Sequence, residues 1–154
     1  MSERTASIVV ICGLILALLI PCEGKSQEYR TVAINADANM YERAQALRAV
    51  NELTSLGYPT RIVEANDNPD ATLFFIRDSF GKFKQNELGR TMLGSIALVF
   101  VDRIQRGNFD LCGVIAHEAG HAAWNLPHMD RGIMVAEAGP DMRCKGQPRV
   151  TEKR

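Results

Sequence analysis

The alternation of apolar and polar residues predicts a strand, a helix and a second strand at the start of the folded part of the chain. Residues 30–36 alternate and are rich in β-branched side chains, with Val32 and Ile34 on one face, which indicates a first strand. Residues 60–65 indicate a second strand, and the polar cluster at 66–70 indicates a turn after it. We therefore expect a right-handed crossover that joins two parallel strands.

The segment between these two strands is predicted to be the crossover helix. Asn39 followed by Glu42 resembles a capping box at a helix N-terminus, and Gly57 with Pro59 ends the helical pattern. Apolar residues at helical spacing define the face that we expect to be buried: Met40, Leu47, Val50, Leu53 and Leu56.

The middle of the chain is predicted to complete the sheet. Residues 71–77 indicate a third strand, and residues 95–101 are apolar on both faces, which is typical of a central strand that ends at Asp102. Residues 78–94 have a mixed composition and predict a surface loop that includes a short edge strand at about 90–93.

The last predicted element is a helix that is capped by Asn108 or Asp110 and ends near Trp124. Its apolar residues would face the sheet, and its opposite face would look onto a cleft. These residues are Leu111, Val114, Ile115, Ala119 and Ala122. The expected fold is α+β, with a mixed, mostly parallel twisted sheet, an antiparallel edge strand, a crossover helix and this final helix. The length of 154 residues suits a single domain.

The first 24 residues differ from the rest of the chain and are typical of a secretory signal. Arg4 precedes an apolar run at 8–20, and a cut before Lys25 would remove the segment. The run is shorter than the roughly 20 residues that span a bilayer as a helix. An uncleaved N-terminal anchor and a lipid-attached Cys22 are the alternatives. We expect three parts: a signal peptide at 1–24, a folded domain at 25–146 and a flexible tail at 147–154.

The charges argue against a nucleic-acid-binding protein, and the cysteines predict a disulfide. The 18 basic and 18 acidic residues give a formal net charge of zero, which is not the positive surface of a nucleic-acid-binding protein. Removal of the signal would leave Cys112 and Cys144, and an even pair of cysteines in an exported protein predicts a disulfide. Two free buried thiols are the alternative.

All three histidines lie within residues 117–128 and predict a catalytic zinc site. His117 and His121 frame Glu118 as H-E-x-x-H on the predicted final helix, so both imidazoles lie on one helix face and can bind the same ion. Glu118 would point toward the open coordination position of that ion. His128 follows at a distance that a chain reversal can bridge, and it would complete the ligand set.

The sequence around these histidines resembles a known family. The stretch H-E-A-G-H-A-A-W-N-L-P-H, with Gly132-Ile133-Met134 after it, is similar to the consensus H-E-x-x-H-x-x-G-x-x-H and the Met-turn of the metzincin metallopeptidases. Its Leu-Pro-His ending is matrixin-like. The resemblance is specific over residues 111–135 and implies a zincin-like fold over residues 30–135, as a minimal catalytic domain. It also implies that Met134 lies beneath the histidines, although an ordinary core methionine would pack in nearly the same way.

The segment that leads to the third histidine departs from this consensus. Trp124 stands where the family has glycine, and His128 comes seven rather than six residues after the second histidine. Asn125 is expected to take the left-handed conformation that the glycine would supply. Asp130 and Glu137 remain alternatives to His128 as the third zinc ligand.

The resemblance implies a secreted or membrane-associated zinc metalloendopeptidase in which Glu118 is the general base. The substrate would be a protein or peptide in extended conformation that pairs with the edge strand near residues 90–94. We expect a monomer with one catalytic zinc ion and no nucleic-acid partner, and contact with a membrane only through an uncleaved N-terminal segment. The alternative is a zinc-binding interaction or structural protein whose site is weakly active or inactive. The intact Glu118 favours the enzyme, because structural zinc sites are closed by a fourth protein ligand.

Overall fold

The computed structural model describes residues 28–84, 86–139 and 142–145. The expected signal segment at 1–24 and the expected tail at 147–154 lie outside these residues. Within the described part of the chain, no helix is both long and apolar enough to cross a membrane.

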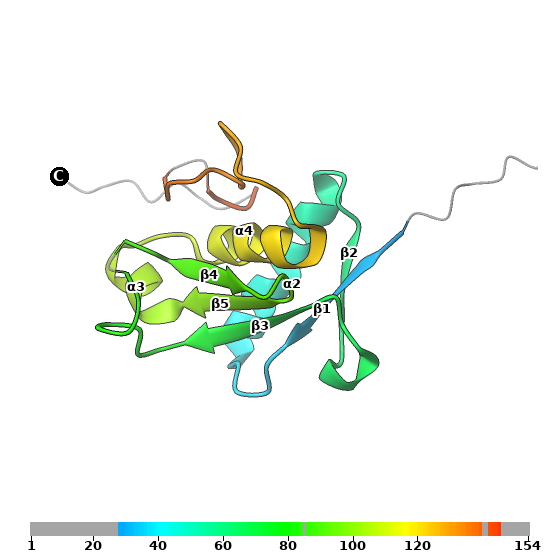
Figure 1. Cartoon of the computed structure of the whole chain (residues 1–154), viewed down its shortest axis with the longest axis horizontal. Coiled ribbons are helices and arrows are strands. Elements are labelled where there is room, and N and C mark those ends of the chain that lie inside the picture. Colours follow the sequence, from blue (N-terminus) through cyan, green and yellow to red (C-terminus); the bar gives the residue numbers. More distant parts are fainter. Residues whose placement is uncertain (1–27, 85, 140–141, 146–154) are drawn as a thin grey trace, which may run out of the picture.

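The described residues form a five-stranded sheet with helices packed against it (Figure 1). The strands lie in the order β2-β1-β3-β5-β4, and all neighbouring pairs are parallel except β4 with β5. The strands are β1 Arg30–Ile34, β2 Thr60–Val63, β3 Ala71–Ile76, β4 Gly89–Met92 and β5 Ile96–Phe100. The helices are α2 Met40–Ser55, α3 Val101–Arg106 and α4 Leu111–Trp124, with a short 3-10 turn, η1, at Ala65–Asp67. The predicted mostly parallel sheet with an antiparallel edge strand is therefore confirmed.

The core lies between the sheet and the pair of helices α2 and α4, which pack against each other. In β3 the inward residues Ala71, Leu73 and Phe75 are buried, whereas the residues between them are only partly buried. This period of two shows that the helices cover one face of the sheet. The apolar residues of α4 that were expected to face the sheet are all buried.

Helix α2 begins as predicted but buries only part of the expected apolar face. The side chain of Asn39 accepts from the backbone N–H of Glu42 at 2.9 Å, and the Glu42 carboxylate accepts from the backbone N–H of Asn39 at 2.8 Å, so the capping box is confirmed. Val50 and Leu53 are buried as predicted, whereas the prediction is wrong for Met40, Leu47 and Leu56, which are 87%, 53% and 42% exposed. Small residues at the contact allow α2 to approach both α4 and the sheet; the buried apolar residues are Ala46, Ala49, Val50 and Leu53.

Helix α3 was not predicted, because residues 95–101 were assigned to one strand that ends at Asp102. The strand ends instead at Phe100, and the chain continues directly into α3. Val101 and Ile104 are three residues apart and both buried, which is the helical spacing that the longer apolar run concealed.

The predicted disulfide between Cys112 and Cys144 is present, with a Cα–Cα distance of 5.8 Å. It joins the first turn of α4 to the segment 142–145. The Asp110 carboxylate, which caps α4, also accepts from the backbone N–H of Cys144 at 2.9 Å. Gly113 makes this crossing possible, because a Cβ there would lie 2.1 Å from the carbonyl oxygen of Met142. The segment after the histidines is thus tied to the start of the helix that carries them.

Candidate metal centre

Helix α4 carries His117, Glu118 and His121, and the residues at its two ends fix where it starts and stops. At the N-terminus, the side chain of Asp110 accepts from the backbone N–H of Gly113 at 3.3 Å. At the C-terminus, Asn125 has φ 53°, so the predicted left-handed turn at this asparagine is confirmed. The chain reverses there and returns along the helix.

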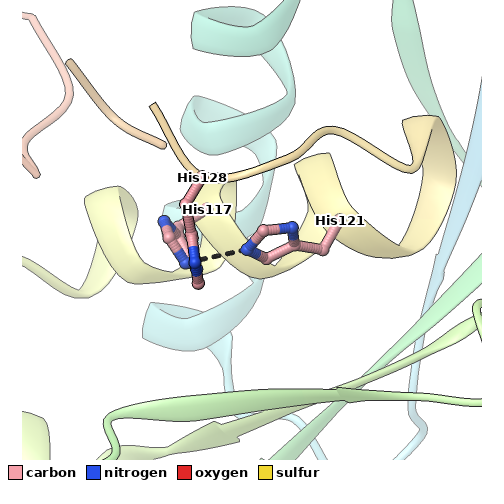
Figure 2. A group of neighbouring side chains, drawn as sticks. All are labelled: His117, His121 and His128. Carbon is pink, nitrogen blue, oxygen red and sulfur yellow. Dashed lines mark hydrogen bonds between the residues drawn. The ribbon is translucent and has the colours of Figure 1, made fainter. Parts of the chain in front are cut away.

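This reversal brings the third histidine to the other two. The imidazole nitrogens of His117, His121 and His128 that could bind a metal all lie within 4.8 Å of one another, and together they could hold a metal ion. Figure 2 shows the three rings next to one another, beside α4 and the segment that follows it. In the described part of the chain, neither Asp130 nor Glu137 belongs to this group.

Backbone carbonyls fix the tautomers of the two helix histidines. Nδ1 of His117 lies 2.8 Å from the carbonyl oxygen of Ile133, and Nδ1 of His121 lies 2.5 Å from that of Leu126. A carbonyl oxygen only accepts, so each Nδ1 carries the proton and donates it. Each Nε2 therefore presents a lone pair, which is the arrangement that metal-binding histidines usually have.

The spacing of these lone pairs fits a tetrahedral metal ion. The Nε2 atoms of His117 and His121 lie 3.1 Å apart, the contact drawn as a dashed line in Figure 2. Two nitrogen ligands at about 2.0–2.1 Å from a tetrahedral zinc ion would be about 3.3–3.4 Å apart. Two neutral rings with facing lone pairs repel each other, and a cation between them removes this repulsion. The chemistry and spacing of these two nitrogens therefore suit a tetrahedral metal ion such as zinc.

Burial keeps the two helix histidines neutral. It lowers the pKa of His117 to about 4 and lowers the pKa of His121 as well, although the hydrogen bonds to the carbonyls act in the opposite direction. His117 is 6% exposed, whereas His128 is exposed to solvent. Neutral imidazoles are the form that binds metals, so both rings are ready to bind an ion at neutral pH.

Glu118 lies between α4 and the edge strand β4. Its side chain is only 6% exposed, and Oε2 accepts a hydrogen bond from the Thr91 hydroxyl at 3.0 Å. Burial raises the pKa of Glu118 to about 7, while the hydrogen bond from Thr91 opposes this shift. A carboxyl group with a pKa near neutrality can both accept and return a proton at neutral pH.

A cleft of about 360 Å³ runs between β4 and the segment that follows the histidines. All three histidines and Glu118 line it. Residues 86–91 form one wall, and Ala136, Ala138 and Met142 lie on the other. The histidine group therefore opens into a space bounded by the edge of the sheet.

Met134 packs against the same helix. It is 3% exposed, and a Cβ at Gly120 would lie 2.7 Å from its Sδ atom. Gly120 stands between the two helix histidines in sequence, and Met134 fills the space that its missing side chain leaves. This position agrees with the expected Met-turn residue as well as with an ordinary core methionine, so the assignment stays a prediction.

Trp124 closes the core instead of lining the cleft. Its indole N–H donates to the Thr60 hydroxyl at 3.0 Å, and its ring lies 5.8 Å from that of Tyr58. Trp124 is not among the residues that line the histidine cleft. Trp124 thus anchors the end of α4 to the start of β2.

Sequence reasoning missed Arg103, which organises the loop leading to β4. Its guanidinium group is buried and donates to four backbone carbonyls of this loop: Ser79 at 2.8 Å, Phe83 at 3.1 Å, Glu87 at 3.1 Å, and Lys84. The neighbouring Asp102 accepts from the backbone N–H of Ser79 at 2.8 Å and from its hydroxyl at 2.9 Å. No local motif predicts these contacts, because they join residues about 20 positions apart and require α3, the helix that carries Arg103.

No protein-family model matches this chain, and a comparison with curated proteins found no similar sequence.

Proposed function

We propose that this chain is a zinc-dependent metalloendopeptidase of the metzincin type, with a matrixin-like site. The observation that carries the proposal is the convergence of His117, His121 and His128 on one point, with the Nε2 lone pairs of the two helix histidines free, in a cleft that also contains Glu118. Three histidine ligands leave one coordination position open, which is typical of catalytic zinc and not of structural zinc.

The proposed chemistry needs a proton acceptor beside the metal, and Glu118 supplies it. A bound zinc ion would supply Lewis-acid activation of a water molecule and of the scissile carbonyl. Glu118 would accept the proton of that water as it attacks the peptide and would then return the proton to the leaving amine. In the metal-free protein, burial already raises the pKa of Glu118 to about 7, which supports its assignment as the group that exchanges a proton.

The proposed substrate is a peptide in extended conformation. Among the described residues, β4 is the last strand of the sheet and pairs only with β5, which leaves its other edge for a substrate backbone. The same strand lines the histidine cleft. Addition of the substrate as a further strand would place its backbone beside the metal site.

An exported location is part of the proposal. The Cys112–Cys144 disulfide supports it, because stable disulfides form in oxidising compartments and are rare in the cytosol. We infer a secreted protein, or one held at a membrane through its N-terminal segment.

The test is metal analysis combined with cleavage of a mixed peptide library by the purified chain. We expect one zinc ion per chain, cleavage that a chelator abolishes, and recovery of cleavage when zinc is restored. Glu118→Gln is the matched control, since it should keep the zinc and lose turnover by at least about 100-fold. One bound zinc without any cleavage would favour the alternative, a zinc-binding interaction or structural protein. Equal cleavage by wild type and Glu118→Gln would refute the assignment of the base.

A further inference from the structure

The carboxyl group of Glu118 is held by the edge strand as well as by its own helix. The Thr91 hydroxyl lies 3.0 Å from Oε2 of Glu118 and 3.3 Å from the backbone carbonyl oxygen of the same residue. Thr91 belongs to β4, whereas Glu118 belongs to α4, so this contact links the two elements that bound the cleft.

Gly89 allows the carboxyl group to reach this position. A Cβ at Gly89 would lie 2.6 Å from both Cγ and Oε1 of Glu118, which is closer than real Cβ contacts. Gly89 and Thr91 are two residues apart on β4, so they share the strand face that meets Glu118. Gly89 thus leaves space for the carboxyl group of Glu118, and Thr91 donates a hydrogen bond to it.

The Thr91 hydroxyl has two acceptors on Glu118, because it can turn between Oε2 and the backbone carbonyl oxygen of the same residue. Serine carries the same hydroxyl group and can make the same contacts.

We propose that Thr91 is a positioning residue that holds the carboxyl group of Glu118 against β4. This inference rests on the proposed function, in which Glu118 is the general base. A carboxyl group on a long side chain would otherwise rotate about its last bonds, and small misplacements of a reacting group reduce rates strongly. Thr91 removes this freedom by a hydrogen bond to the carboxyl group, so it acts on the reaction through Glu118.

The first test compares Thr91→Val, which keeps the shape and removes the hydroxyl, with Thr91→Ser, which keeps the hydroxyl. With a peptide found in the library screen, Thr91→Val should lower kcat by about tenfold or more and leave KM within about twofold, and Thr91→Ser should recover most of kcat. Zinc content should be unchanged in both variants. Thr72→Val, at a threonine of β3 outside the cleft, controls for the general effect of this substitution. Unchanged kcat in Thr91→Val would overturn the proposal.

The second test does not depend on activity. Crystal structures of the metal-free wild type and Thr91→Ser should show the Glu118 carboxyl group in one conformation, whereas Thr91→Val should show it rotated or in several. The same single conformation in all three proteins would refute the role of Thr91. If the wild type cleaves no peptide, the proposed function fails, and the Glu118 conformation alone then decides whether Thr91 holds this side chain.

Discussion

The Nε2 atoms of His117 and His121 lie 3.1 Å apart. Both rings carry their proton on Nδ1, so no proton lies between these two nitrogens and their lone pairs face each other. The carbonyls of Ile133 and Leu126 hold the rings in this arrangement, and both carbonyls belong to the segment after α4. The folded chain thus arranges two lone pairs toward each other before any ion binds. Such a site is preorganised, and ion binding should stabilise a structure that is already formed.

Zinc should therefore raise the melting temperature of a protein that is already folded without it. At a free zinc concentration of about 100 times Kd, the stabilisation is about 2.7 kcal/mol, and the melting temperature should rise by roughly 10 °C. Thermal unfolding followed by circular dichroism, with a chelator and with zinc, measures the difference. A chelated protein without cooperative unfolding would show that folding depends on the metal, contrary to this prediction.

The third ligand can be identified by comparing three substitutions. His128→Ala should weaken zinc binding by about 100-fold or more, because loss of a direct ligand should exceed the 10–100-fold cost of losing a hydrogen-bond partner of a ligand. Asp130→Asn and Glu137→Gln, at the two alternative positions, should leave the affinity within about threefold. Competition with a chromophoric chelator gives the three affinities. A larger loss in either control than in His128→Ala would move the third ligand to that residue.

The pKa shifts of His117 and Glu118 predict opposite effects on the stability of the metal-free protein. Burial lowers the pKa of His117 from 6.5 to about 4. As the pH falls, the unfolded chain is therefore protonated at this histidine before the folded chain is. The contribution of His117 to the free energy of unfolding is lost as the pH falls from about 6.5 to about 4. Burial raises the pKa of Glu118 from 4.5 to about 7, so its contribution is full below about 4.5 and is lost as the pH rises toward 7.

Two single substitutions separate these contributions. Relative to wild type, His117→Gln should gain stability as the pH falls from 6.5 to 4.5, and Glu118→Gln should lose it, each by up to about 1.4 kcal/mol per pH unit. Urea unfolding in the presence of a chelator at several pH values measures how the free energy of unfolding of each protein changes with pH. Parallel curves for the three proteins would mean that neither group is perturbed by burial.

The disulfide predicts a difference in both stability and cleft structure. It closes a loop with a sequence separation of 32 residues. In the chain-entropy model, its loss in the Cys112→Ala, Cys144→Ala double variant should lower the free energy of unfolding by about 3–4 kcal/mol. Met142, which lines the cleft two residues before Cys144, should also exchange its backbone hydrogen faster. Denaturant unfolding and hydrogen exchange test the two parts, and a loss below about 1 kcal/mol would contradict the first.

Local sequence signals were enough to predict the parts of the site that depend on neighbouring residues. Asp110 and Asn125 fix the two ends of α4, and a cap and a left-handed turn can both be recognised from a few adjacent residues. The capping box of α2 was predictable for the same reason. The spacing of His117 and His121 then follows from helix geometry alone.

The features that the sequence did not predict depend on contacts between distant elements. Met40 and Leu47 follow a helical spacing but are exposed. Ala46 and Ala49 are buried instead, because small residues let α2 pack closely against α4. The contact of Thr91 with Glu118 joins residues 27 apart, and it requires the register of β4 and the space at Gly89. These features depend on packing between distant parts of the chain, and a short stretch of sequence does not reveal such packing.

Arg103 provides the last prediction, because one buried guanidinium group holds the loop that forms a wall of the cleft. It is 4% exposed, and no carboxylate of the described residues lies within ion-pair distance, so its hydrogen bonds go to backbone carbonyls. Arg103→Met should leave these carbonyls without their donor and lower the free energy of unfolding by about 2–4 kcal/mol.

The same substitution should expose the loop at residues 79–87 to proteases. Arg103→Lys should recover only part of the stability, because an ammonium group has three donors on one atom and cannot span the same carbonyls. Arg106→Met, at an exposed arginine of the same helix, is the control; it removes a cation–π contact with Phe80 and should stay within about 1 kcal/mol of wild type. Denaturant unfolding and limited proteolysis with mapped cut sites measure both effects. If Arg103→Met is as stable and as resistant as Arg106→Met, the wall of the cleft does not depend on this guanidinium group.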